Sequence, residues 1–279
     1  MSDHYQIITG IVSELEIFDT EQQFLKTRKL AGLPALGLFF LGDVVAAASQ
    51  LNTTDSNEEA AEFLNSVQYF RCKMGSNIIE GIFCRVFFNN GDQVEVVVEP
   101  RSDGSYFAYA LRRLIDHRLW LHPWATKGTK AVNKSALKFA VLLASFFLIG
   151  ITISDLISIP ISKYSSFFRD SFIVTIILYF SFILFVYFLH KRFSGKDSHI
   201  ADKNFAALGY ADPKQVDMEA EFYKFYAYRD ENLPNFYVDI NSAQYKQQPP
   251  EGAKWVTFYR EAPPIPEYIK VIRTEDYDE

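Results

Sequence analysis

Cysteine is scarce in this sequence of 279 residues, which contains only Cys72 and Cys84. Both lie in apolar segments of the kind that form strands, and neither has a second cysteine or a histidine at the spacing of a zinc site. Two cysteines do not supply the dense disulfide framework of a small secreted domain. We therefore predict two buried, reduced thiols and no metal site.

Catalytic signatures are also missing. The sequence has no G-x-S-x-G elbow, no H-E-x-x-H helix, no phosphate-binding P-loop and no dinucleotide fingerprint. His117 and His122 lie close together in the sequence, but side chains five positions apart on a strand point to opposite faces. On a strand they could not bind the same metal ion. We predict no enzymatic activity, no catalytic residue and no cofactor.

An excess of positive charge is lacking as well. The formal net charge is -6 at pH 7, whereas nucleic-acid-binding domains usually carry a basic surface. Residues Met1 to Gly10 are polar and lack the basic start and apolar core of a cleavable signal. We expect no nucleic-acid partner and no cleaved leader.

Two long uncharged runs dominate the second half of the sequence. Ser171 to Leu189 contains 19 uncharged residues, and a helix of this length spans about 28 Å, close to the ~30 Å hydrocarbon core of a bilayer. Phe139 to Ser154 contains 16, and Lys138 at its start can reach the membrane surface. We predict transmembrane helices at 135–157 and 171–190, joined by a short external loop at 158–170. The lipid bilayer is then the first partner.

The charges that flank these runs orient them. Basic residues are concentrated before the first run and after the second, whereas the connector between the runs has two charges of each sign. The flanking basic residues are Lys127, Lys130, Lys134, Lys138, Lys191, Arg192, Lys196 and Lys203. We predict a two-span protein of the bacterial inner membrane with both termini in the cytoplasm.

Residues 1–134 are predicted to form a small cytoplasmic β-domain. Apolar and polar residues alternate there, and clusters of Gly, Asn and Asp separate the apolar segments. The expected strands are a long, bent first strand at 5–18 and five more at 63–72, 78–88, 93–99, 106–112 and 118–122. The firmest turn is Asn89-Asn90-Gly91-Asp92, because glycine supplies the positive φ of a tight hairpin. Short strands after a bent first strand indicate a partly open barrel of the OB type, or a small sandwich.

An apolar insertion at residues 30–51 interrupts this β-domain. It contains a single charged residue, Asp43, and several glycines. One crossing of the membrane here would place the lysines of 127–138 on the wrong side. Two alternatives remain, a helix that packs on the barrel or lies in the membrane interface, and a short re-entrant hairpin that turns at Gly37 or Gly42.

Residues 191–279 are predicted to form a small cytoplasmic α+β region. Apolar residues at 200–208 follow helical spacing and stop at Gly209, which is typical of a helix C-terminus. Aromatic and polar residues then alternate, and the acidic stretch 274–279 is predicted to be a disordered tail. The expected fold class is an α+β membrane protein with an OB-type β-domain, a transmembrane hairpin and this C-terminal region.

Several segments of the sequence carry a family resemblance. They are Gly81-Ile82-Phe83, Phe87 to Glu99, Tyr106 to Ala110, Arg118 to Pro123, Gly128 and Phe205 to Tyr210, continuing to Asp217. Together these segments resemble a bacterial family of two-span membrane proteins labelled type VI secretion system effectors. The sequence departs from that family at Leu111-Arg112-Arg113 and at Trp124. The resemblance implies a role at the membrane in contact-dependent competition between bacteria, and it brings no catalytic residues.

Three functions are consistent with these observations. The first is an effector that acts at the inner membrane by inserting residues 139–189, as a homo-oligomer. The second is a membrane-resident immunity or accessory protein that holds a cognate effector or another component of the secretion apparatus. The third is an unrelated membrane-anchored OB-type scaffold. The resemblance places the effector first, whereas the stable topology and the lack of toxin chemistry favour a resident protein.

Overall fold

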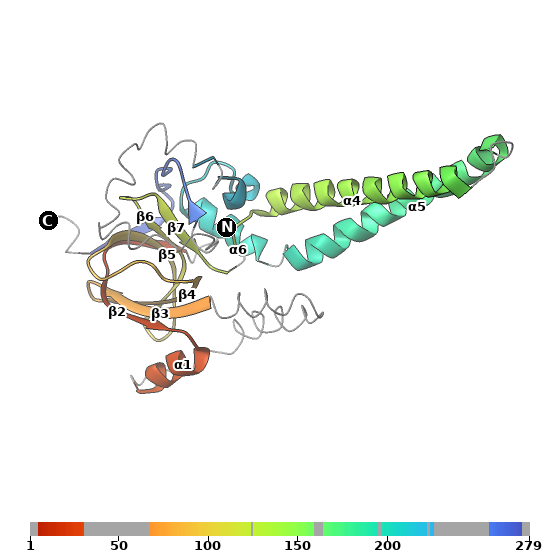
Figure 1. The fold of residues 1–279 in the computed structure, drawn as a ribbon. Helices are drawn as coiled ribbons and strands as arrows, with labels where there is room; N and C mark the ends of the chain where they lie inside the picture. The colour runs from red at the N-terminus through yellow and green to blue at the C-terminus, as the bar shows by residue number, and fades with distance from the viewer. Residues whose placement is uncertain are drawn as a thin grey trace, which may run out of the picture.

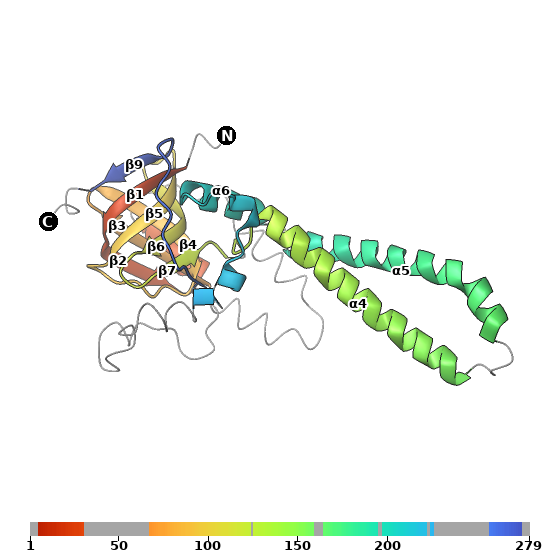
Figure 2. The same cartoon turned by 90° about the horizontal axis from the view of Figure 1, so that it is seen from above.

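The chain forms an α+β structure in which a curled mixed sheet lies at one end and two long helices project from it (Figure 1, Figure 2). The computed structural model describes residues 5–30, 67–123, 125–158, 164–194, 197–221, 224–225 and 257–274. The strands are β1 (Gln6–Ile11), β2 (Ser13–Phe18), β3 (Val67–Met74), β4 (Asn77–Cys84), β5 (Gln93–Pro100), β6 (Tyr106–Arg113), β7 (Arg118–Leu121), β8 (Thr257–Phe258) and β9 (Lys270–Arg273). The helices are α1 (Glu21–Leu30), α4 (Thr129–Ser158), α5 (Tyr164–Ser194), α6 (Ser198–Ala207) and the short 3₁₀ helix η2 (Pro213–Gln215).

The sheet curls into a half-barrel, and the first part of the chain contributes one strand near each end of the strand order. The strand order is β2-β3-β4-β6-β5-β1-β9, with β7 beside β6 and β8 beside β7. Only Val12 separates β1 from β2, yet these strands lie far apart along the sheet. The predicted first strand is therefore present as two strands that meet in a bend at Val12.

The predicted hairpin at residues 89–92 is wrong. The β4 strand pairs with β3 and β6, and β5 pairs with β6 and β1, so the turn does not join neighbouring strands. The predicted strand 78–88 ends early at Cys84, because Arg85 adopts a positive φ of 55° and breaks the extended backbone. The Gly91 N–H instead donates to the Val12 carbonyl at 2.8 Å, so the turn supports the bend in the first strand.

Both faces of the sheet are buried, which produces two apolar cores. The interior core is centred on Phe70, Phe83, Phe88 and Trp120, and the rings of Phe88 and Trp120 meet edge to face at 5.5 Å. The outer core lies under α1, α6 and the C-terminal residues. A strand that is buried on both sides reads as an almost continuous apolar run, which accounts for the sequence Val94-Glu95-Val96-Val97-Val98 in β5.

The predicted α+β region at 191–279 contains the helix α6 and two strands, and these strands belong to the same sheet as the N-terminal strands. The β9 strand pairs in parallel with β1, and β8 pairs in antiparallel fashion with β7. The Tyr259 hydroxyl adds a hydrogen bond to the Arg113 carbonyl at 3.1 Å. Chain segments that are more than 100 residues apart thus close one sheet.

The α6 helix ends where the sequence predicts. Gly209 adopts a φ of +90° and its N–H donates to the Ala206 carbonyl, while the Tyr210 N–H donates to the Phe205 carbonyl. These two bonds and the contact of the Phe205 and Tyr210 rings form a Schellman cap. A side chain at Gly209 would also collide with the Pro264 carbonyl oxygen, 2.0 Å from the Cβ position.

The two long helices exceed the predicted spans. The α4 helix has 30 residues and α5 has 31, so each is about 45 Å long. The predicted loop at 158–170 is too long, because α5 already begins at Tyr164. The apolar insertion, from residue 31 onward, lies outside the described residues, as do the predicted strand residues 63–66 and the tail beyond Thr274.

Candidate functional site

A seam of small residues joins α4 and α5. Ala140 and Ala144 are buried on α4 and pack against Ile183 and Val186 of α5. Small side chains allow two helix backbones to approach closely, which is typical of helix pairs in membranes. The Ser145 and Tyr179 hydroxyls also lie 3.1 Å apart across this seam. The seam is therefore packed, and the hydroxyls of Ser145 and Tyr179 are partners for each other.

The outer faces of both helices expose large apolar side chains. The exposed ones are Leu137, Phe139, Val141, Leu142, Phe146, Phe147, Ile149 and Ile153 on α4, and Ile176, Ile177, Leu178, Phe180, Leu184, Phe185, Phe188 and Leu189 on α5. Phe146 is 72% exposed and Leu142 is 71% exposed. The core helix of a soluble protein would be mostly buried, whereas these two helices are long and apolar enough to cross a membrane and bury little of themselves in the protein.

A carboxylate from α6 caps the first turn of α4. Asp202 accepts two hydrogen bonds from Thr129, one from the backbone N–H and one from the hydroxyl, both at 2.8 Å. A negative charge at a helix N-terminus satisfies a free N–H and interacts favourably with the helix dipole. The start of α4 is therefore fixed to α6, which itself packs on the outer core of the sheet.

A second connection holds the residues just before α4. The Gly128 N–H donates to the Val216 carbonyl at 2.9 Å, and the Met218 N–H donates to the Thr126 carbonyl at 3.0 Å. Gly128 is required here, because a Cβ would lie 2.4 Å from the Pro213 carbonyl oxygen. We call residues 125–130, α6 and residues 212–219 the junction. It joins the helix pair to the sheet at several points instead of through one free linker.

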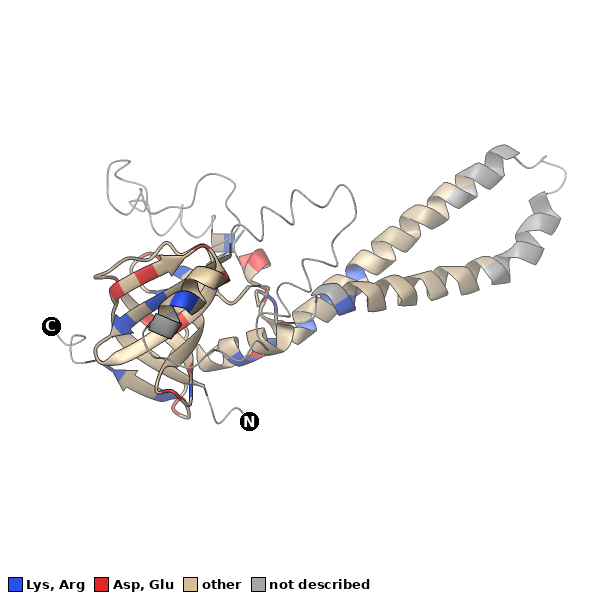
Figure 3. Ribbon diagram, turned by 90° about the horizontal axis from the view of Figure 1, so that it is seen from below, with Lys and Arg blue, Asp and Glu red and all other residues tan. Residues whose placement is uncertain are grey.

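Acidic residues of the junction neutralise two of the lysines that flank the first helix. Lys127 pairs with Glu219 at 2.6 Å, and Lys130 pairs with Asp212 at 3.3 Å. The sequence around these lysines contains no acidic residue, so the sequence alone does not predict these ion pairs. The exposed Lys134 and Lys138 farther along α4 have no such partner among the described residues. Figure 3 shows basic residues at the ends of α4 and α5 near the sheet.

A buried arginine connects the sheet to the end of α6 and to the segment between β8 and β9. Arg112 of β6 is 4% exposed and forms a salt bridge with Glu95 of β5, which is 8% exposed. The same guanidinium donates to the Leu208 carbonyl at the end of α6 and to the Pro263 carbonyl, each at 3.2 Å. One side chain thus links three regions of the chain.

The histidines and cysteines singled out in the sequence occupy separate structural positions. His117 lies 2.9 Å from the Tyr259 carbonyl through Nδ1, whereas His122 is buried beside the rings of Phe107 and Tyr109. Burial lowers the pKa of His122 to about 4. Within the described ranges no group of three His, Cys, Asp or Glu residues could hold a metal ion.

Both cysteines are buried, free thiols. Cys84 lies opposite Val67, and Cys72 lies opposite Ile79 on the adjacent strand. The two positions are five residues apart along the strands, or about 17 Å, which is too far for a disulfide. Burial raises the pKa of each thiol to about 12, so neither is a reactive thiolate.

Sequence reasoning found the helix pair but missed the junction and Arg112. The capping carboxylate and the lysine partners lie 73 to 92 residues away from the groups they contact. Comparison with family models, curated proteins and solved structures gives no match to this chain.

Proposed function

We propose that this chain is a two-span protein of the bacterial inner membrane that holds its half-barrel at the cytoplasmic surface. The observation that carries the proposal is the belt of exposed apolar side chains on α4 and α5. In water this surface would be unfavourable, because burying apolar area contributes about 25 cal/mol per Å². In a bilayer the same side chains meet lipid, and the helices satisfy their own backbone groups.

The sheet supports an even number of crossings. Strand β1 comes before the helix pair and β9 after it, and the two are hydrogen-bonded neighbours. Strands β7 and β8 form a second pairing of this kind. Segments that share one sheet lie on one side of a membrane, so the chain between them crosses twice or not at all. This reasoning is independent of the charge rule and supports the placement of both sheet segments on the same side of the membrane.

The half-barrel fits the OB type that the sequence suggests. A bent first strand, β1 with β2, pairs with β5 at one end and with β3 at the other. Strands β4 and β6 then complete five strands in a Greek-key order, with β4 and β6 parallel. The OB architecture is a five-stranded, partly open Greek-key barrel, and the order of these strands supports that assignment. Strands β7, β8 and β9 extend it.

For the biological role we propose a part in type VI secretion-linked competition, as the sequence resemblance implies. Within that role the helix pair favours a resident immunity or accessory protein over a pore-forming effector. Phe139 to Ser154 and Ser171 to Leu189 carry no charge that could line an aqueous path. The hydroxyl groups of Ser145 and Tyr179 also pair with each other inside the seam. A packed anchor joined to its domain suits a protein that holds a partner at the membrane.

Reporter fusions test the topology. Fusions after Lys130 and at Glu279 are expected to report the cytoplasm, because Lys130 lies in the junction beside the sheet and Glu279 follows β9 in the sequence by only a few residues. A fusion after Lys163 is expected to report the periplasm, because residue 163 lies between the two helices. A periplasmic C-terminus would contradict the two-span arrangement, and resistance of the protein to alkaline extraction from membranes provides the control for insertion.

Induction of the chain in a bacterium without the secretion system tests the role. We expect the membrane potential, followed with a voltage-sensitive dye, to remain unchanged for the first minutes after induction. The matched control carries Ile176→Arg and Phe182→Arg, each of which costs about 2.5 to 3.5 kcal/mol for insertion at a helix centre. Rapid depolarisation by the parent, absent in this control, would make the effector the better assignment.

A further inference from the structure

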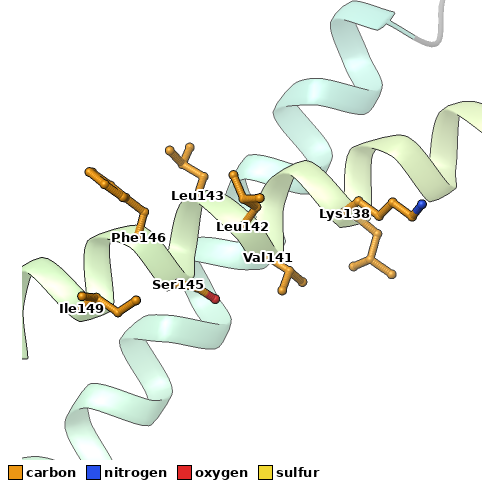
Figure 4. Close-up of a pocket in the computed structure, with 8 residues that line it drawn as sticks. Lys138, Val141, Leu142, Leu143, Ser145, Phe146 and Ile149 are labelled. Atoms are coloured by element: carbon orange, nitrogen blue, oxygen red, sulfur yellow. The ribbon is translucent and has the colours of Figure 1, made fainter. Parts of the chain in front are cut away.

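An open groove runs along the first helix of the pair. Its volume is about 900 Å³, and Figure 4 shows Lys138 at one end and Ile149 at the other. The remaining lining residues, Leu137, Val141, Leu142, Leu143, Ser145 and Phe146, are apolar except for Ser145. The hydroxyl of Ser145 already has Tyr179 as its partner. The groove is therefore an open, largely apolar strip along α4 with one basic end.

The length of the groove matches one leaflet of a bilayer. Lys138 and Ile149 are 11 residues apart, which corresponds to about 16 Å along a helix. Half of the ~30 Å hydrocarbon core is about 15 Å. If Lys138 lies at the cytoplasmic surface, Ile149 lies near the middle of the membrane, and the groove follows the path of one acyl chain.

The charge at the basic end is available for a ligand. Lys134 precedes Lys138 by four residues, so both lie on the same face of α4. Both are exposed, and neither has an acidic partner in the parts of the chain that the structure describes. Lys127 and Lys130, by contrast, are paired with acids of the junction. The acids of the junction therefore neutralise the two lysines nearest the sheet, whereas Lys138 at the end of the groove and Lys134 one helical turn before it keep their charge.

We propose that this groove binds an anionic phospholipid, with one acyl chain along Val141 to Ile149 and the phosphate held by Lys134 and Lys138. The inference rests on the proposed membrane insertion and adds a lipid class to it. Charge favours an anionic headgroup, since each basic residue near such a surface contributes roughly 1 kcal/mol. The apolar floor favours a hydrocarbon chain over a soluble phosphate compound.

Native mass spectrometry of the full chain, released from vesicles that contain equal amounts of phosphatidylglycerol and phosphatidylcholine, tests the proposal. We expect one retained phosphatidylglycerol per protein. The double variant Lys134→Gln, Lys138→Gln is expected to lower the affinity for phosphatidylglycerol about 30-fold, the factor for two lost lysine contacts. A matched control, Lys191→Gln with Arg192→Gln, removes the same charge from the end of α5, outside the groove, and is expected to retain the lipid.

Each other outcome overturns a different statement. Equal loss in both double variants would mean diffuse attraction to the membrane surface and would overturn the groove as a site. A dimer that retains no lipid would mean that a second copy of the chain fills the groove. Equal retention of phosphatidylcholine by an inserted protein would also overturn the lipid class. A protein that does not enter the vesicles at all would contradict the proposed function itself.

Discussion

Replacement of Arg112 by Met is expected to lower the free energy of unfolding by about 3 to 5 kcal/mol, the largest effect of any single substitution considered for this chain. The variant removes the partner of Glu95, whose carboxylate is nearly as buried as the guanidinium. It also removes the donor to the Leu208 and Pro263 carbonyls. An uncompensated buried charge costs far more than the pair itself contributes.

Denaturant unfolding of the detergent-solubilised protein, followed by tryptophan fluorescence, measures this effect. The double variant Arg112→Met, Glu95→Met is expected to recover a large part of the loss, because neither charge then remains buried alone. Lys73→Met provides the control, since its pair with Glu14 is exposed and is expected to contribute less than about 1 kcal/mol. A loss of under about 1 kcal/mol for Arg112→Met would show that water replaces its partners.

Acidification is expected to destabilise the protein through His122. Burial lowers the pKa of the folded state to about 4, whereas an unfolded histidine titrates near 6.5. The unfolded chain therefore binds the extra proton as the pH falls from about 6.5 to about 4, and stability is lost over this window. Through His122 the free energy of unfolding is expected to fall by about 2 kcal/mol at pH 5 and by about 3 kcal/mol at pH 4, relative to its value at neutral pH.

Unfolding at pH 7 and pH 5 isolates this contribution when wild type is compared with His122→Gln. The variant keeps a polar side chain but cannot titrate. Between pH 7 and pH 5 its free energy of unfolding is therefore expected to fall by about 2 kcal/mol less than that of the wild type. His199→Gln changes an exposed histidine of α6 and is expected to keep the wild-type pH dependence. Identical pH dependence in wild type and His122→Gln would contradict a neutral, buried ring.

Local patterns were sufficient for much of the fold. The two helices, α6 with its Gly209 cap, and most strands follow from periodicity, turn residues and charge, all of which act within about ten residues. The hairpin at 89–92 is the informative error. Its asparagines and glycine do form a turn, but the Asn90 side chain accepts a bond from the Leu15 N–H, so the turn serves a distant strand.

The long-range parts could not be predicted in the same way. Asp202 looks like an ordinary exposed polar residue of a helix, and nothing local shows that it caps α4. Arg112 lies near the end of an apolar strand, where the sequence alone does not distinguish a buried arginine from an exposed one that ends the strand. Both roles depend on which segments pack together, and that choice is set by the whole sheet.

The pairing of β9 with β1 and of β8 with β7 has a consequence for how the protein is made. A ribosome delivers β1 to β7 first, then α4 and α5, and only afterwards the residues that complete the sheet. If the chain adopts the proposed two-span topology, insertion of the helices comes before closure of the half-barrel. Until then the edges of β1 and β7 lack these neighbours, and Arg112 lacks its acceptors on Leu208 and Pro263. In the proposed topology the membrane step is therefore a checkpoint in biogenesis, because final folding waits for the helices to bring the C-terminal residues back to the side on which synthesis began.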